Sequence, residues 1–124
     1  MQSLAKQSNG VVKYADVYSI FDMLAIIAAS DLFVGTSLHG NITAFSFGIP
    51  HVFGPLPVAK AEGFLKITNL PAELKMHSWN QLNDKIECAV TQGRDFFLDK
   101  AREAKARVYG LIDEIIASID SASA

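Results

Sequence analysis

The chain has 124 residues, of which half are hydrophobic and 19% are charged, and this composition indicates a folded domain and excludes a disordered chain. Its formal net charge of −2 excludes the excess of Lys and Arg that a nucleic-acid partner requires. A single cysteine, Cys88, excludes an internal disulfide, and the apolar run that includes Leu24–Ala29 is far shorter than the roughly 20 residues of a membrane span. We therefore expect one cytoplasmic domain over residues 1–124, with no membrane span and no nucleic-acid partner.

The first third of the chain alternates predicted strands and helices. We expect a short strand over Val11–Tyr14, a helix after Asp16, and a buried strand over Leu32–Gly35. The second strand follows from a continuous apolar run that polar residues bound on both sides. The helix follows from apolar residues at helical spacing, namely Val17, Ile20, Phe21, Leu24, Ile27 and Ala28.

A second helix begins at Leu38 and has a well-marked end. Gly48 suits the left-handed position after a helix, and Pro50 prevents the helix from continuing. The run His51–Phe53 then predicts a third strand. The resulting order, βαβαβ with short connections, predicts an α/β fold with a parallel sheet and right-handed crossovers.

The rest of the chain is predicted to be mostly helical. A weak helical pattern covers Glu62–Ile67, Ser78 caps a helix from Trp79 to about Thr91, and a long helix extends beyond Gly93 to about Ile119. Lys75 and Met76 are candidates for a short fourth strand. The long helix carries an apolar stripe of Phe97, Ala101, Ala104, Val108, Leu111, Ile112, Ile115 and Ile119, and Gly110 within it predicts a kink or close packing.

The segment between the Leu32–Gly35 strand and the Leu38 helix is the candidate functional site. In open parallel sheets, ligands bind beyond the carboxyl ends of the strands, where the first N–H groups of a helix point outward and favour an anion. His39 is the one side chain there that exchanges a proton near neutral pH. We expect His39 to be catalytic and the residues that bind substrate to be Thr36, Ser37, Leu38, Gly40, Asn41 and Lys60.

Simpler structural roles compete with this interpretation. Thr or Ser before a helix is first of all an N-cap, and a lone histidine is more often structural than catalytic. His51 and His77 lack Cys, Asp or Glu partners at metal-ligand spacing, so no metal site is expected. Cys88 fits a small buried thiol.

The segment ASDLFVGTSLHGNITAFSFGIPHVF, residues 29–53, resembles the carboxyl-terminal signature of the polysaccharide pyruvyl transferase family. The signature has an apolar strand, small polar residues, a Leu-His pair, a helix and a Gly-x-Pro pattern. Lys60 and the following EGFLKITNL resemble the weaker downstream pattern of the family.

This resemblance implies a fold and a reaction. It implies a Rossmann-like three-layer domain, with a sheet of three or four strands flanked by helices and a long C-terminal helix. Such a domain is the C-terminal half of a two-domain enzyme of the GT-B type, so a missing N-terminal domain would complete the cleft and the isolated chain would be inactive. The implied reaction moves a pyruvyl group from phosphoenolpyruvate onto a saccharide acceptor of a surface polysaccharide, without a cofactor.

The resemblance also bears on the site. His39 matches the motif histidine, which is implicated in substrate binding or acid–base work. Many members carry arginine two residues before that histidine, whereas this chain has Ser37. Binding of an anion would therefore depend more on helix N–H groups and on Lys60 than in members that have the arginine.

Two other function classes stay open. A GT-B glycosyltransferase or epimerase domain would hold a nucleotide-sugar diphosphate on the same helix terminus. A noncatalytic interaction domain would instead use Phe45, Phe47, Phe53 and the long terminal helix as a docking surface.

Overall fold

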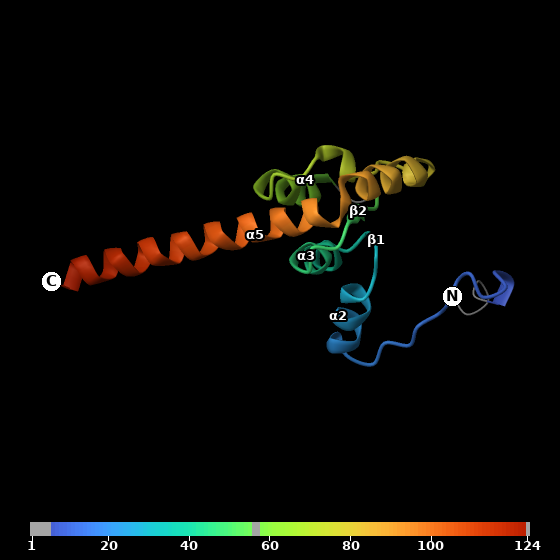
Figure 1. Ribbon diagram of the computed structural model, residues 1–124, viewed down its shortest axis with the longest axis horizontal. Helices are drawn as coiled ribbons and strands as arrows, with labels where there is room; N and C mark the ends of the chain where they lie inside the picture. The colour runs from blue at the N-terminus through green and yellow to red at the C-terminus, as the bar shows by residue number, and fades with distance from the viewer. Residues whose placement is uncertain (1–5, 56–57, 124) are drawn as a thin grey trace.

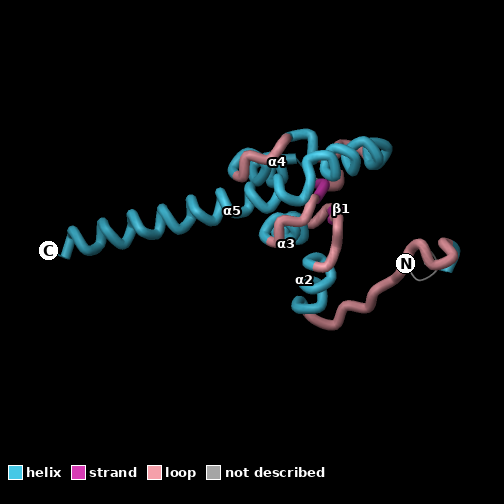
Figure 2. Tube along the Cα trace, viewed as in Figure 1, coloured by secondary structure: helices cyan, strands magenta, loops and turns pink. Residues whose placement is uncertain are grey.

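The computed structural model describes residues 6–55 and 58–123 and shows a small helical body from which one long helix extends (Figure 1). Figure 2 shows how little of the chain is strand. In chain order the elements are α2 (Ile20–Ala28), β1 (Phe33–Gly35), α3 (Leu38–Ser46), β2 (His51–Phe53), α4 (Val58–Ile67), the 3-10 turns η1 (Ala72–Leu74) and η2 (Trp79–Gln81), and α5 (Leu82–Ser123).

The sheet of the described residues has two parallel strands. Phe33 pairs with His51 and Gly35 with Phe53. The predicted fourth strand is reduced to one parallel bridge between Phe53 and Lys75. The α/β class and the long C-terminal helix are confirmed, whereas the three-layer, Rossmann-like sheet of three or four strands is not confirmed.

The predicted strand over Val11–Tyr14 is wrong. This segment is irregular and joins no strand, and its side chains lie in solvent, with Val11 87% exposed. Apolar residues favour a strand only where a neighbouring strand supplies hydrogen bonds and a packed face. The described part of the chain offers this segment no such neighbour.

Helix α2 begins where its side chains can cap it. The Ser19 hydroxyl accepts a hydrogen bond from the Asp22 N–H at 3.2 Å, and the Asp22 carboxylate accepts one from the Tyr18 N–H at 3.1 Å. This reciprocal arrangement satisfies two amides at the helix start. The helix predicted after Asp16 is therefore confirmed with its first residue at Ile20.

Gly48 takes the left-handed position after helix α3, as the sequence predicts. Gly48 has a φ of +68° and donates its N–H to the Phe45 carbonyl at 2.9 Å, and the Ile49 N–H reaches the Ala44 carbonyl at 2.9 Å. These two bonds satisfy the last carbonyls of the helix. A Cβ at Gly48 would lie 3.0 Å from the Cα of Leu98, so this turn also lies close against α5.

The core lies between the sheet and the helices α3, α4 and α5. Its largest fully buried side chains include Phe53, Phe97, Leu74 and Met76. Helix α5 changes direction at Gly93, whose φ of +81° and ψ of 162° are not helical, so the two predicted helices on either side of this glycine are confirmed.

The kink predicted at Gly110 is wrong, and the close packing that was its alternative does not occur among the described residues. Gly93 is the non-helical residue inside α5, and a Cβ added at Gly110 would meet nothing within 4 Å. Beyond the body of the molecule, α5 extends without contact to any other labelled element (Figure 1). Among the described residues, no helix has the length and apolar character that crossing a bilayer requires.

Candidate functional site

The start of α3 offers amide groups that the protein itself leaves unpaired. The Ser37 hydroxyl accepts a hydrogen bond from the Gly40 N–H at 3.2 Å, and the Ser37 carbonyl accepts one from the Asn41 N–H at 3.1 Å. Among the hydrogen bonds of the described residues, none starts from the amide N–H of Leu38 or His39. Two outward amides at a helix N-terminus, with the positive end of the helix dipole, suit an anion.

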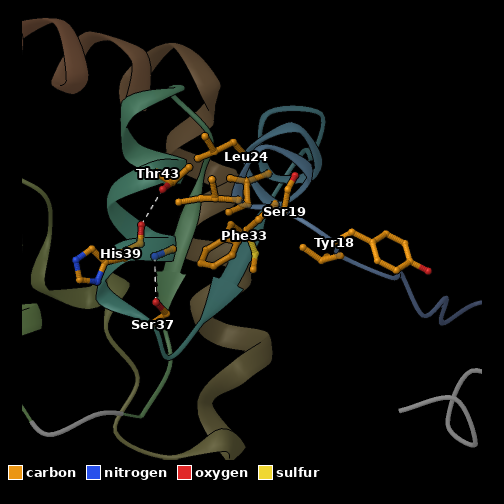
Figure 3. Close-up of a pocket in the computed structure, with 12 residues that line it drawn as sticks. Tyr18, Ser19, Leu24, Phe33, Ser37, His39 and Thr43 are labelled. Carbon is orange, nitrogen blue, oxygen red and sulfur yellow. Dashed lines mark hydrogen bonds between the residues drawn. The ribbon is translucent and has the colours of Figure 1, made fainter.

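His39 is exposed in the first turn of α3. Figure 3 shows its imidazole pointing away from Phe33 and Leu24 and therefore away from the apolar interior. Its backbone carbonyl accepts a hydrogen bond from the Thr43 hydroxyl at 2.8 Å, which holds this turn of the helix. The ring is thus free to meet a ligand that approaches the two unpaired amides.

A pocket of about 510 Å³ lies between α2 and α3 (Figure 3). Its lining is mostly apolar and includes Leu24 and Phe33, and Ser37, His39 and Thr43 of α3 also line it. The helical periodicity of α2 did not predict this pocket, because an apolar stripe is read first as core. The sequence signal for this pocket was that α2 has more apolar residues than one buried helix face can hold. Ile20, for example, is 69% exposed.

Asn41 faces the interior instead of the solvent. Its side chain is fully buried, and its amide Nδ2 donates to the Gly35 carbonyl at 3.0 Å and to the Ser37 carbonyl at 2.9 Å. These bonds fix the turn that leads from β1 into α3 and so place Ser37 and the residues after it. The Asn41 side chain thus positions the site, and the direct ligand contact expected for it stays a prediction.

Gly40 has a packing role that the sequence did not indicate. A Cβ at Gly40 would lie 2.7 Å from the Cζ of Phe33, and a Cβ at Gly35 would lie 2.6 Å from the same atom. The Phe33 ring therefore fills the space beside both glycines and forms part of the pocket wall. Approach of a ligand to the Gly40 backbone stays a prediction.

Thr36 and Lys60 complete the predicted set. Thr36 is exposed and its methyl group lies over Gly54, where an added Cβ would meet Thr36 Cγ2 at 2.8 Å. Lys60 is exposed in the first turn of α4. Because β1 and β2 are parallel and in register, α3 and α4 begin at the same edge of the sheet. No interaction of the described residues joins Lys60 to His39, so their joint action stays a prediction.

His51 has the opposite environment from His39. It is fully buried, and the Phe45, Phe53 and Phe97 rings surround it with ring centres 6.2, 5.8 and 5.1 Å away. Burial lowers its pKa from 6.5 to about 4, against a smaller raising effect of the hydrogen bond to the Ile49 carbonyl. Since a carbonyl only accepts, Nδ1 carries the proton of the neutral ring. His51 is a structural residue.

The described residues contain no group of three or more His, Cys, Asp or Glu side chains that could hold a metal ion. The start of α3 offers an exposed imidazole, two hydroxyls and unpaired backbone amides, and α4 with Lys60 begins at the same edge of the sheet. This set can bind an oxyanion and move a proton.

Comparison with known families matches residues 2–53 to the family described as polysaccharide pyruvyl transferase. The match confirms the resemblance seen in the sequence and contains α2, β1, α3 and β2, with the whole start of α3. Lys60 lies outside the matched residues. Neither the curated proteins nor the solved structures include a match to this chain.

Proposed function

We propose that this protein is part of an enzyme that transfers a pyruvyl group from phosphoenolpyruvate to a saccharide of a surface polysaccharide. The proposal starts from residues 2–53, which match the polysaccharide pyruvyl transferase family. The observation that carries the proposal is the exposed imidazole of His39 beside the unpaired amides of Leu38 and His39. The reaction belongs in the cytoplasm, in keeping with a single cysteine and no disulfide.

The reaction makes a cyclic ketal and needs no cofactor. The methylene carbon of the donor takes up one proton, two acceptor hydroxyls form C–O bonds to the adjacent carbon, and the bond from that carbon to the phosphate oxygen breaks. Of the two hydroxyl protons released, one balances the new methyl group and the other leaves with phosphate. His39 transfers one of these protons, a step that a positioned side chain accelerates by about 10²–10⁴-fold.

The start of α3 holds the donor anion in this proposal. The amides of Leu38 and His39 donate to a phosphate or carboxylate oxygen. The Ser37 hydroxyl accepts from the Gly40 N–H and so keeps its own hydrogen to donate. Thr36 adds a second hydroxyl, and Lys60 supplies the positive charge that arginine provides in many family members.

We further propose that the chain supplies one half of a two-domain enzyme of the GT-B type, with a missing N-terminal domain across the cleft. The two-stranded sheet of the described residues supports this, because such a small sheet offers one wall of a cleft. Kinetic tests therefore use the complete enzyme.

The direct test replaces His39 with Gln in the complete enzyme and measures phosphate release from phosphoenolpyruvate with a saccharide acceptor. We expect kcat to fall by at least about 100-fold, because the proton-transfer group is lost. His77→Gln is the matched control, since His77 is also exposed but lies in the loop before η2. Unchanged kcat in His39→Gln would show that His39 has no catalytic role.

Calorimetry with phosphoenolpyruvate and with a UDP-sugar separates this function from the glycosyltransferase alternative.

A further inference from the structure

The Asn41 side chain makes hydrogen bonds to carbonyls that the backbone has already paired. Its Nδ2 donates to the Gly35 carbonyl at 3.0 Å and to the Ser37 carbonyl at 2.9 Å. The Gly35 carbonyl also accepts from the Gly54 N–H at 2.8 Å, and the Ser37 carbonyl accepts from the Asn41 N–H at 3.1 Å. The side chain therefore supplies a second donor to each carbonyl, and neither carbonyl would be left unpaired without it.

The same side chain also leaves one buried atom without a partner. The Oδ1 of Asn41 is buried and has no hydrogen bond among the described residues, and a buried unpaired acceptor destabilises a protein. An apolar side chain of similar size would avoid this loss. Asn41 is 0% exposed, so its surroundings lie within this chain and do not depend on a further domain. Stability alone therefore does not account for an asparagine at this position.

The two side-chain bonds of Asn41 close the turn between β1 and α3. Gly35 is the last residue of β1, and Ser37 is the N-cap of α3. One amide group thus joins the end of the strand to the start of the helix, an arrangement that we call the Asn41 clamp. Thr36 and Ser37, whose hydroxyls the proposed function assigns to the donor, belong to the turn that the Asn41 clamp closes.

The bond to Ser37 also fixes the direction of an unpaired amide. The Ser37 carbonyl and the Leu38 N–H belong to one trans peptide unit, and in such a planar unit the two groups point in opposite directions. The buried Asn41 amide holds this carbonyl toward the interior, so the Leu38 N–H faces outward. In the described part of the chain this N–H has no acceptor, and it is one of the two amides that hold the donor anion in the proposed function.

We propose that Asn41 is a positioning residue for phosphoenolpyruvate, which keeps the Leu38 N–H aimed at the donor anion without touching the donor itself. This inference rests on the proposed function, because it assigns Asn41 a part in binding the donor of that reaction. Without the Asn41 clamp the Ser37–Leu38 peptide can rotate, and donor binding weakens. Proton transfer by His39 depends less on the clamp, because the Thr43 hydroxyl holds the His39 carbonyl separately.

Two substitutions of the same shape separate the hydrogen bond from the volume of the side chain. In a helix, a threonine hydroxyl can donate to the carbonyl four residues earlier, as Thr43 and Thr68 do in this protein. Ser37 lies four residues before Asn41, so Asn41→Thr keeps a donor for the Ser37 carbonyl. Asn41→Val has the same branched shape and no donor.

Steady-state kinetics of the complete enzyme tests the proposal. We expect Asn41→Val to raise the KM for phosphoenolpyruvate at least about 10-fold and to change kcat less than about 3-fold, because the Leu38 amide binds the donor alike in the ground state and the transition state. Asn41→Thr should have a KM at least about 3-fold below that of Asn41→Val. A purely structural role of the side-chain volume would not separate these two variants.

Thr68→Val is the matched control. Thr68 is buried near the end of α4, and its hydroxyl and its N–H both donate to the Phe64 carbonyl, as the side chain and N–H of Asn41 do to the Ser37 carbonyl. Thr68→Val removes the same kind of second donor far along the chain from the start of α3. It should leave the KM for phosphoenolpyruvate unchanged.

The outcomes that overturn the inference are distinct from those that overturn the reaction. An unchanged KM in Asn41→Val, or an equal increase in Asn41→Val and Asn41→Thr, would overturn the role of Asn41 while a loss of kcat in His39→Gln still supported the reaction. Unchanged kcat in His39→Gln would instead count against the proposed function. If Asn41→Val did not fold, an NMR titration of Asn41→Thr with phosphoenolpyruvate would decide. We expect its Leu38 amide signal to shift as in the wild type, and loss of that shift would overturn the proposal.

Discussion

At the scale of the residue, the two histidines of β2 and α3 show how the fold assigns roles to identical side chains. His39 stands in solvent at a helix start, while His51 is enclosed by three phenylalanine rings. Desolvation makes a charged imidazole unfavourable at His51. Of these two histidines, His39 is the one whose ring is open to solvent.

The buried histidine makes stability depend on pH. The pKa of His51 is about 4 in the folded state, against 6.5 for an ordinary solvent-exposed histidine, so the unfolded chain binds more protons between these pH values. Stability should therefore fall as pH drops from about 6.5 to about 4, by about 3 kcal/mol in total for this group. Urea unfolding at several pH values, compared between wild type and His51→Gln, measures the effect.

We expect the difference in unfolding free energy between wild type and His51→Gln to shrink toward low pH, because the variant lacks the titrating group. Carboxylates that titrate below pH 5 affect both proteins and cancel in the difference. His77→Gln, an exposed histidine, should keep the wild-type pH dependence. If the difference in unfolding free energy stayed constant between about pH 6.5 and 4, the lowered pKa of His51 would be refuted.

At the scale of the element, the end of α3 depends on one glycine. Gly48→Ala places a Cβ at a φ of +68° and within 3.0 Å of the Leu98 backbone. We expect it to destabilise the protein by about 2–4 kcal/mol, from the left-handed conformation together with the clash against α5. Thermal or urea unfolding gives the value.

Gly110→Ala is the control for that substitution. Gly110 is in the helical interior of α5 with no atom near an added Cβ, so alanine there should stabilise the helix by about 0.5–1 kcal/mol. If both variants unfolded at the same urea concentration, the close approach at Gly48 would not matter for stability.

Elements with local signals were predictable from the sequence. Ser37 and Gly48 mark the two ends of α3, and Ser19 marks the start of α2, because capping uses residues within one turn of each other. The Val11–Tyr14 strand failed for the opposite reason. A strand needs hydrogen bonds from a neighbouring strand that is distant in sequence. The residues of the segment itself do not show whether such a neighbour is present.

The candidate site was predictable to the extent that it is contiguous. Residues 36–41 lie together because they follow one another, and the strand–turn–helix pattern places them at a sheet edge. The inward direction of Asn41 and the contact of Phe33 with Gly40 arise from packing between elements. Spacing along the chain cannot show such contacts.

At the scale of the whole molecule, the apolar stripe of α5 is covered over only part of its length. The periodicity of α5 predicted a single buried face, but the structure divides it into a packed part up to Ala104 and an exposed part from Val108 to Ile115. Periodicity reports that a face must be covered and not what covers it.

The most direct measurement of the central claim is an NMR titration of the chain with phosphoenolpyruvate, following each backbone amide. Binding at the start of α3 predicts that the amide signals of Leu38 and His39 shift first and saturate together, and that inorganic phosphate shifts the same signals. If those two amides stayed unmoved while phosphoenolpyruvate bound elsewhere or not at all, the assignment of this helix start as the anion site would be contradicted.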